Sequence, residues 1–136
     1  YPNITVLETQ FNDDDANKAS AQVNAVVARA PDLAGIFGAN LFSAIGSADG
    51  VKAMGKTGEI KVVAFDAPTR IVDDLKSGLV DLAIAQHPAE IGYMGVMVAF
   101  GHVTGNPVPV SVGTGFTVMT ADNIDDPDIS KYVYSD

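Results

Sequence analysis

The segment GVKAMGKTGEIKVVAFD, Gly50 to Asp66, decides how the chain folds, because it contains a helix end, a turn and a strand in that order. Its beginning, Gly50 to Thr57, also matches the phosphate-loop pattern of nucleotide-binding proteins. A phosphate loop needs a strand before its glycines and a helix after its Lys-Thr pair. Here the order is reversed, because Gly55 stands where a helix C-terminal glycine belongs and Gly58 leads into the next strand. We therefore predict a helix–turn–strand junction and no nucleotide site.

The alternation of strand and helix continues on both sides of this junction. Upstream, the acidic cluster Asp13–Asp15 is expected to cap a helix, which Pro31 ends. Downstream, Gly78 ends a helix, the region Val108–Thr120 is β-prone, and the polar end of the chain is expected to form a short surface cap. Four successive strand–helix units predict an α/β fold, with helices on the faces of a mainly parallel sheet. The predicted strands are Ile4–Thr9, Gly35–Gly38, Ile60–Phe65 and Leu82–Ala85, and the last helix spans Glu90–Val103.

Composition narrows the classes of function. The chain has 136 residues, of which 47% are hydrophobic, and this suits one folded domain. A net charge of −9 gives no basic surface for nucleic acid, and the absence of Cys removes disulfides and thiolate metal sites. No apolar run is long enough to span a membrane. Because the chain opens directly on a predicted strand, without a signal segment, we expect it to be a piece of a longer protein.

Two further patterns suggest metal sites but lack residues that such sites require. The acidic cluster resembles the start of a calcium loop, but Lys18 and Asn24 replace the Gly and Glu that such a loop requires. His87 and His102 have no partner at metal-ligand spacing, so they are interpreted as surface or hinge residues. No serine stands in a nucleophile pattern. We therefore expect no metal, no cofactor and no catalytic residue.

The residues that follow the predicted strands form a coherent polar set. Asn40 follows the second strand, Asp66 the third and Gln86 the fourth, while the first leads into the stretch from Phe11 to Asp14. Ligands of open parallel sheets bind beyond the carboxyl ends of the strands. Carboxylate and amide groups suit a neutral, polyhydroxylated ligand. The alternative is that Asn40 and Asp66 only cap the helices that follow them.

Three blocks of this sequence resemble the C-terminal half of periplasmic sugar-binding proteins of the ribose/galactose type. The blocks are PDLAGIFGAN, VVAFDAP and LAIAQHPAEIGYMGV, and the resemblance covers nearly the whole chain. The family consists of receptors of ABC importers, and its relatives include the effector domains of LacI-type repressors. The resemblance implies the C-terminal lobe of a type I periplasmic binding protein, a three-layer α/β/α fold in which two lobes close on a sugar.

The resemblance also implies roles for single residues. Asn40, Asp66 and Gln86 match the side chains that hydrogen-bond sugar hydroxyls, and Phe65 matches an apolar residue near the sugar. Asp14 stands where ribose receptors place an aromatic ring that stacks on the sugar. A second departure is Leu41, at a position that is usually acidic in the family.

The implied organisation divides residues 1–136 into three parts. Residues 1–86 form the lobe proper, residues 87–104 a helix that crosses to the N-terminal lobe, and residues 105–136 the hinge return and tail. Because that N-terminal lobe lies before Tyr1, we expect this chain alone either to dimerise or to leave the crossing helix displaced.

The predicted function is that of a non-enzymatic, periplasmic receptor that binds a monosaccharide or polyol and delivers it to an ABC transporter permease. One alternative is the effector-binding domain of a LacI-type transcription regulator. The other is a nucleotide-dependent enzyme that uses the Gly50–Thr57 loop.

Overall fold

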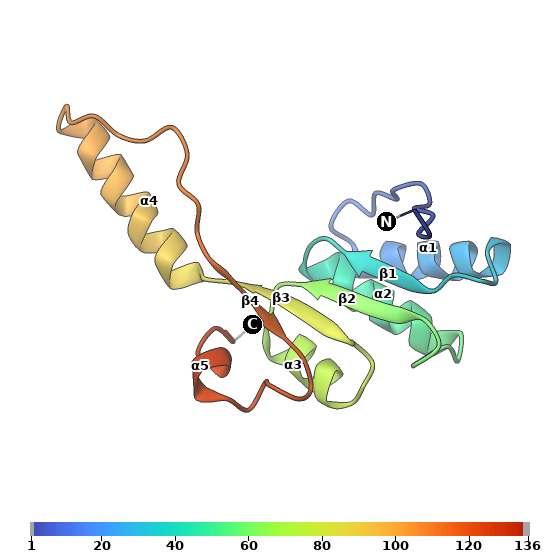
Figure 1. Cartoon of the computed structure of the whole chain (residues 1–136). Helices are drawn as coiled ribbons and strands as arrows, with labels where there is room; N and C mark the ends of the chain where they lie inside the picture. Colours follow the sequence, from blue (N-terminus) through green and yellow to red (C-terminus); the bar gives the residue numbers. More distant parts are fainter. Residues whose placement is uncertain (1, 135–136) are drawn as a thin grey trace.

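A mixed sheet with helices forms the body of the chain (Figure 1). The structure is a computed structural model and describes residues 2–134. The helices are α1 (Ala16–Arg29), α2 (Leu41–Ala53), α3 (Thr69–Lys76), α4 (Pro88–Val103) and α5 (Pro127–Ser130). The strands are β1 (Gly35–Gly38), β2 (Lys61–Phe65), β3 (Leu82–Gln86) and β4 (Phe116–Met119). The predicted α/β class is confirmed.

The sheet is mainly parallel, as predicted. Its order is β1-β2-β3-β4, in which β1 pairs with β2 and β2 with β3 in parallel, while β4 runs antiparallel to β3. Gly35 lies opposite Lys61, and Gln86 lies opposite Phe116. This order brings the carboxyl ends of β1, β2 and β3 to the same edge of the sheet, where the predicted polar residues follow the strands.

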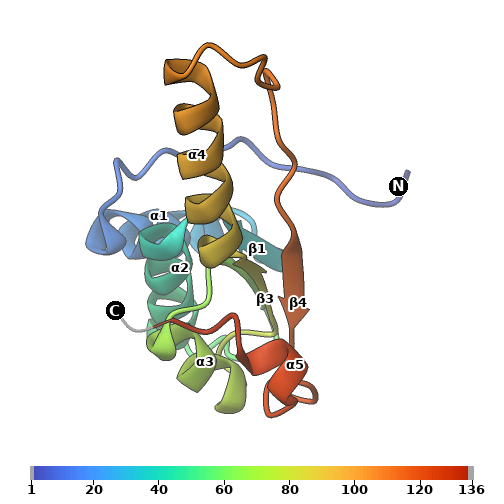
Figure 2. The ribbon, with the colours of Figure 1, turned by 90° about the vertical axis from the view of Figure 1, so that its left-hand side faces the viewer.

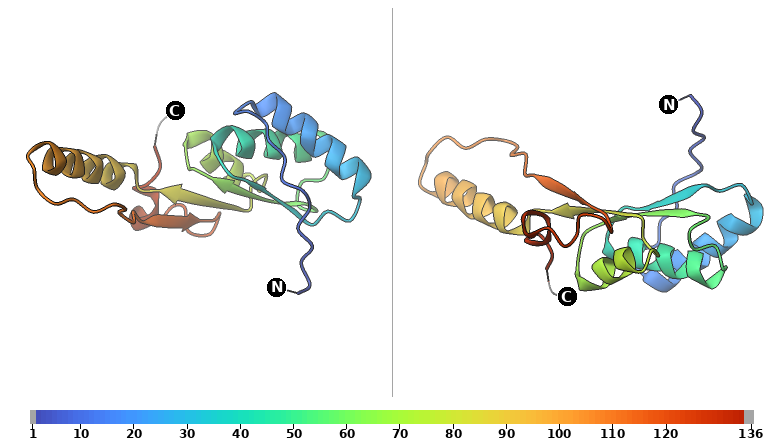
Figure 3. Two further views of the ribbon diagram at one scale, coloured as in Figure 1. Left: turned by 90° about the horizontal axis from the view of Figure 1, so that it is seen from above. Right: turned by 60° about the horizontal axis from the view of Figure 1, so that its bottom comes forward.

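Helices α1, α2 and α3 lie on one face of the sheet (Figure 3). Val62 and Ala64 of β2 and Ala83 and Ala85 of β3 are buried toward these helices, because alternate residues of a strand share a face. On the opposite face Phe116 is 66% exposed. Residues 2–134 therefore supply one helical layer, where the sequence predicted helices on both faces.

The expected strand Ile4–Thr9 does not form. Residues 2–10 are outside any strand or helix, and within the described chain they make no backbone hydrogen bond to other backbone groups. The run is rich in β-branched residues, but β1, the edge strand of the sheet, does not pair with it. Strand propensity depends on a neighbouring strand, so without one the run stays extended and exposed, and Val6 is 86% exposed.

The helix–turn–strand junction at the phosphate-loop motif is confirmed. Helix α2 ends at Ala53, and Gly55 follows with a φ of +67°, a conformation that glycine adopts without strain. The next strand, β2, begins at Lys61. No helix starts at Lys56 or Thr57, so the motif lacks the helix N-terminus that binds phosphate.

Helix α4 and the segment that follows it project away from the sheet (Figures 1 and 2). No residue of α4 is buried, although the helix is apolar, and Tyr93, Val96 and Phe100 are more than 60% exposed, at 64%, 69% and 62%. None of the helices in residues 2–134 is long and apolar enough to cross a membrane.

Candidate functional site

Asp66 and Gln86 form a direct pair at the carboxyl edge of the sheet. Nε2 of Gln86 donates to Oδ1 of Asp66 over 2.6 Å, and both side chains are partly buried. Gln86 is the last residue of β3, and Asp66 follows the last residue of β2, Phe65, which is half-buried. The adjacent strands β2 and β3 therefore bring together three of the predicted site residues.

The backbone of Asp66 takes a conformation that few non-glycine residues adopt. Its φ is +81°, which lies in the left-handed region, where Asp and Asn are tolerated better than most residues. The N-cap of the following helix, α3, is Pro68 and has no side-chain capping bond, so Asp66 does not cap it. The alternative role suggested by the sequence is therefore wrong for Asp66, whose carboxylate accepts from Gln86 instead.

Asn40 caps the helix that follows it, which is the alternative role considered for it, and its amide nitrogen makes a second contact. Its Oδ1 accepts from the backbone N–H of Ser43 over 2.8 Å, which makes it the N-cap of α2. Its Nδ2 donates to Oδ1 of Asp14 over 2.9 Å. The helix cap thus fixes the amide and leaves its nitrogen to hold Asp14, which has a φ of +60°.

The three carboxylates of the acidic cluster contact different partners. Asp15 caps α1 by accepting from the backbone N–H groups of Asn17 and Lys18, as the sequence predicted. Asp13 pairs with the amino group of Lys18. Asp14 is the member that reaches Asn40.

Two further hydrogen bonds near the contact between Asn40 and Asp14 were not predicted from the sequence. Oγ of Ser43 donates to Oδ1 of Asn12 over 2.8 Å, and Nδ2 of Asn12 donates to the carbonyl of Asp15 over 3.0 Å. These bonds tie the N-terminus of α2 to the N-terminus of α1. No sequence signal distinguishes Ser43 from a solvated serine of a first helical turn.

Arg70 forms ion pairs with two aspartates. Its guanidinium donates to Asp74 over 2.8 Å and to Asp49 over 2.7 Å, linking α3 to α2. The hydrogen bond that Arg70 donates to Asp74 raises the pKa of Arg70, and the one it donates to Asp49 adds to the effect. The group stays charged at any working pH.

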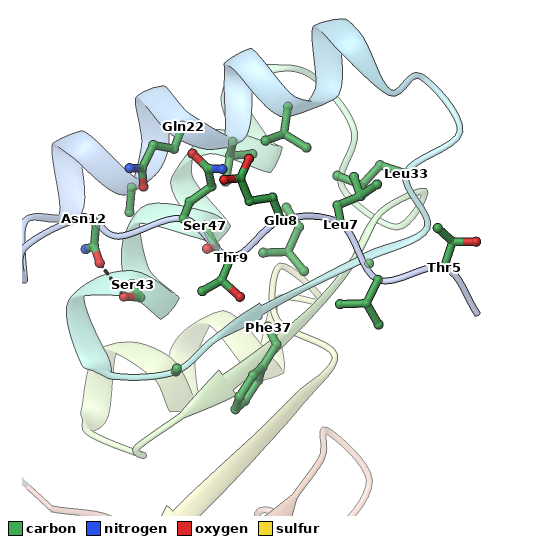
Figure 4. Close-up of a pocket in the computed structure, with 18 of the residues that line it drawn as sticks. Thr5, Leu7, Glu8, Thr9, Asn12, Gln22, Leu33, Phe37, Ser43 and Ser47 are labelled. Atoms are coloured by element: carbon green, nitrogen blue, oxygen red, sulfur yellow. Dashed lines mark hydrogen bonds between the residues drawn. The ribbon is translucent and has the colours of Figure 1, made fainter. Parts of the chain in front are cut away.

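A cavity of about 480 Å³ lies beside α1 and α2, and Asn12 and Ser43 are among the residues that line it (Figure 4). It is enclosed by residues 4–10, by α1 and by the free edge of β1, and Gln22, Phe37 and Ser47 are among its lining residues. None of the predicted sugar-binding residues lines it. The cavity follows from the missing strand pairing described above, because the extended segment runs beside β1 without bonding to it.

The described residues contain no group of three His, Asp or Glu side chains that could hold a metal ion. His87 is not a surface residue, as its exposure is only 9%. It lies between β3 and α4, whereas His102 is exposed.

Hydrogen-bonding side chains at the carboxyl ends of neighbouring parallel strands stand where open α/β sheets bind their ligands. Residues 1–107 match the family model described as "Periplasmic binding protein domain", and the chain belongs to this family. Its fold is that of the type I periplasmic binding proteins.

Solved structures agree with this assignment. A solute-binding protein of an ABC transporter from Agrobacterium vitis, bound with α-D-tagatopyranose, is 63% identical with a TM-score of 0.94. The match covers 99% of this chain and 45% of that chain. A second solute-binding protein from the same organism, with bound D-fucose, is 28% identical with a TM-score of 0.87, covering 96% of this chain and 45% of that one.

Curated relatives belong to the same class. The D-allose-binding periplasmic protein of Escherichia coli is 29% identical over 85% of this chain and 38% of its own length. The ribose import binding protein RbsB of Haemophilus influenzae is 31% identical over 86% of this chain and 39% of its own length. The chain thus spans less than half the length of the relatives it matches.

Proposed function

We propose that this chain is the C-terminal lobe of a periplasmic receptor that binds a monosaccharide for an ABC importer. The observation that carries the proposal is the Asp66–Gln86 pair at the carboxyl ends of adjacent parallel strands. The relatives support a transport receptor, since the solved and curated proteins described above bind sugars. They do not favour a LacI-type regulator.

The proposed binding chemistry uses the hydrogen-bonding capacity that the pair retains. Among residues 2–134, only Gln86 bonds to the carboxylate of Asp66, and it uses Oδ1 alone. Oδ2 of Asp66 and the amide oxygen of Gln86 can therefore accept from sugar hydroxyls. Such charge-assisted bonds are stronger than neutral ones. Asn40 and Asp14 would add a second polar group, and Phe65 an apolar contact.

We further propose that residues 1–86 form the lobe proper, that residues 87–104 cross to a second lobe, and that residues 105–136 return. The sugar would then be held in a cleft between the lobes. One lobe alone presents one wall of such a site, so high affinity requires the complete receptor.

Calorimetric titration of the complete receptor tests this function. We expect D-tagatose, the ligand of the 63% identical protein, to bind with a Kd of about 1 μM or tighter. D-Fucose, D-ribose and D-allose serve as comparison ligands, and MgATP as the control for the nucleotide alternative. Absence of heat with every monosaccharide at millimolar concentration would contradict the proposal, whereas heat with MgATP alone would favour the nucleotide enzyme.

The apolar surfaces of this lobe lead to a prediction about the chain by itself. Met97, Phe100 and Val103 on α4 are exposed by 48%, 62% and 77%, and large contiguous apolar patches mark interaction surfaces. In the complete receptor we expect the second lobe to cover α4. For the 136-residue chain alone, we expect sedimentation equilibrium to give a mass above 14.1 kDa that rises with concentration.

Matched variants identify the surface responsible. Phe100→Lys should shift the chain toward the monomer, because it places a charge within the exposed apolar face of α4. Phe42→Lys should leave the association unchanged, because Phe42 is an exposed phenylalanine of α2, away from α4. A compact monomer at all concentrations would show that α4 does not mediate association between copies of the chain.

A further inference from the structure

His87 stands where both connections to α4 leave the sheet. It directly follows Gln86 and is the N-cap residue of α4. The returning segment enters β4 at Phe116, whose Cα lies opposite Gln86 in the sheet. The two connections therefore run next to each other at this point, as Figures 1 and 2 show.

The imidazole ring makes directed contacts with three segments. Nε2 lies 2.9 Å from Oγ1 of Thr117 in β4, and Nδ1 lies 3.2 Å from Oε2 of Glu90 in the first turn of α4. The ring of Tyr132, from the C-terminal segment, stacks on the imidazole with 3.8 Å between the ring centres and 8° between the planes. The exposure of His87 is 9%, so water competes little for the ring, although the side chain of Glu90 is 56% exposed.

The returning segment approaches the ring so closely that it needs a glycine. A Cβ on Gly115 would lie 2.5 Å from Nδ1 of His87, which is shorter than any tolerated contact. The two connections are therefore packed against each other through the ring itself.

The chemistry of these partners fixes the proton on Nδ1. An ionised Glu90 can only accept, so Nδ1 carries a hydrogen and donates to it. Nε2 of the neutral ring then accepts from the hydroxyl of Thr117. In the protonated ring Nε2 donates to the same hydroxyl oxygen, because a hydroxyl can turn to either role.

A buried histidine with satisfied hydrogen bonds is often only part of a core. What distinguishes His87 is that its hydrogen-bond partners lie on two elements, Glu90 in the first turn of α4 and Thr117 in β4, while its own backbone continues directly from Gln86. A rotation of α4 relative to the sheet would therefore disturb the contact of the ring with Glu90 or its contact with Thr117. Gln86 precedes His87 directly and donates to Asp66 over 2.6 Å, so a change at His87 is one peptide bond away from this pair.

We propose that His87 is a positioning residue, whose ring locks the two connections of α4 together and thereby sets the direction of Gln86 toward Asp66 and the sugar. The inference rests on the proposed function for its effect on the sugar. The locking of the connections does not depend on that function and can be measured without ligand.

The test uses His87→Phe in the complete receptor, because phenylalanine keeps the stacking on Tyr132 and the burial but loses both hydrogen bonds. His102→Phe is the matched control, since His102 is exposed on α4. Without sugar, we expect amide hydrogen exchange of residues 86–91 and 115–118 to rise about tenfold in His87→Phe only. With D-tagatose as the probe, we expect a Kd about five- to tenfold higher, again only in this variant.

A second variant separates positioning from general stability. Thr117→Val removes one partner of the ring and should raise the Kd less than His87→Phe does, and the double variant should behave like His87→Phe alone. A lower unfolding midpoint with unchanged exchange and a Kd within about twofold would show that His87 is only a core residue, and would overturn the inference. If the parent receptor binds no sugar, the proposed function fails, while the exchange rates still support or refute the lock.

Discussion

Asp66→Asn in the complete receptor is expected to weaken sugar binding by about 30- to 150-fold. The substitution keeps the size of the side chain but removes the charge, and a hydrogen bond to a charged group contributes about 2 to 3 kcal/mol. Asn also tolerates the left-handed backbone that residue 66 adopts, at a φ of +81°. Stability should therefore change little, and calorimetry would report the loss of the carboxylate itself.

Two further variants test this interpretation. Asp66→Ala should lose at least as much affinity and, in addition, about 1 kcal/mol of stability, because alanine is strained at this φ. Asp125→Asn is the charge control, because this carboxylate is 84% exposed and pairs at the surface with Lys76. Unchanged affinity in Asp66→Asn would place the sugar elsewhere on the lobe.

The elements that sequence could predict are those whose stabilising contacts are local. The junction at Gly55 was predictable because a helix C-terminus needs a left-handed residue there. The cap of α1 was predictable from its acidic residues, although only the structure selects Asp15 among them. Strands β1, β2 and β3 were predictable because their apolar runs are short and bounded by turn residues.

Features that depend on a distant partner were not predictable in this way. The run Ile4–Thr9 has strand composition, but a strand also needs a neighbour to bond to, and β1 does not pair with it. The burial of His87 depends on Thr117 and Tyr132, which lie far along the chain. In the same way, the sequence placed Asn40, Asp66 and Gln86 at one edge of the sheet, but it could not show that Gln86 bonds to Asp66.

Gly46→Ala is expected to destabilise the chain by about 1 to 3 kcal/mol, although alanine is the better helix former. Helices α1 and α2 pack so closely that a Cβ on Gly46 would lie 2.2 Å from the carbonyl oxygen of Ala16 and 2.5 Å from the Cβ of Ala19. One of these contacts is with the backbone, so α1 itself must move away. Urea unfolding of the two chains side by side measures the difference.

Gly92→Ala provides a control of opposite sign. Gly92 lies within α4, and a Cβ there would meet nothing within 4 Å, so alanine should stabilise that helix by up to about 1 kcal/mol. Stabilisation by both substitutions would mean that α1 can be displaced from α2 at no cost. Destabilisation by Gly46→Ala alone would show that close packing holds together the N-termini of α1 and α2. Because Asp14 and Asn40 meet at those N-termini, over 2.9 Å, the same displacement should then lower sugar affinity in the complete receptor.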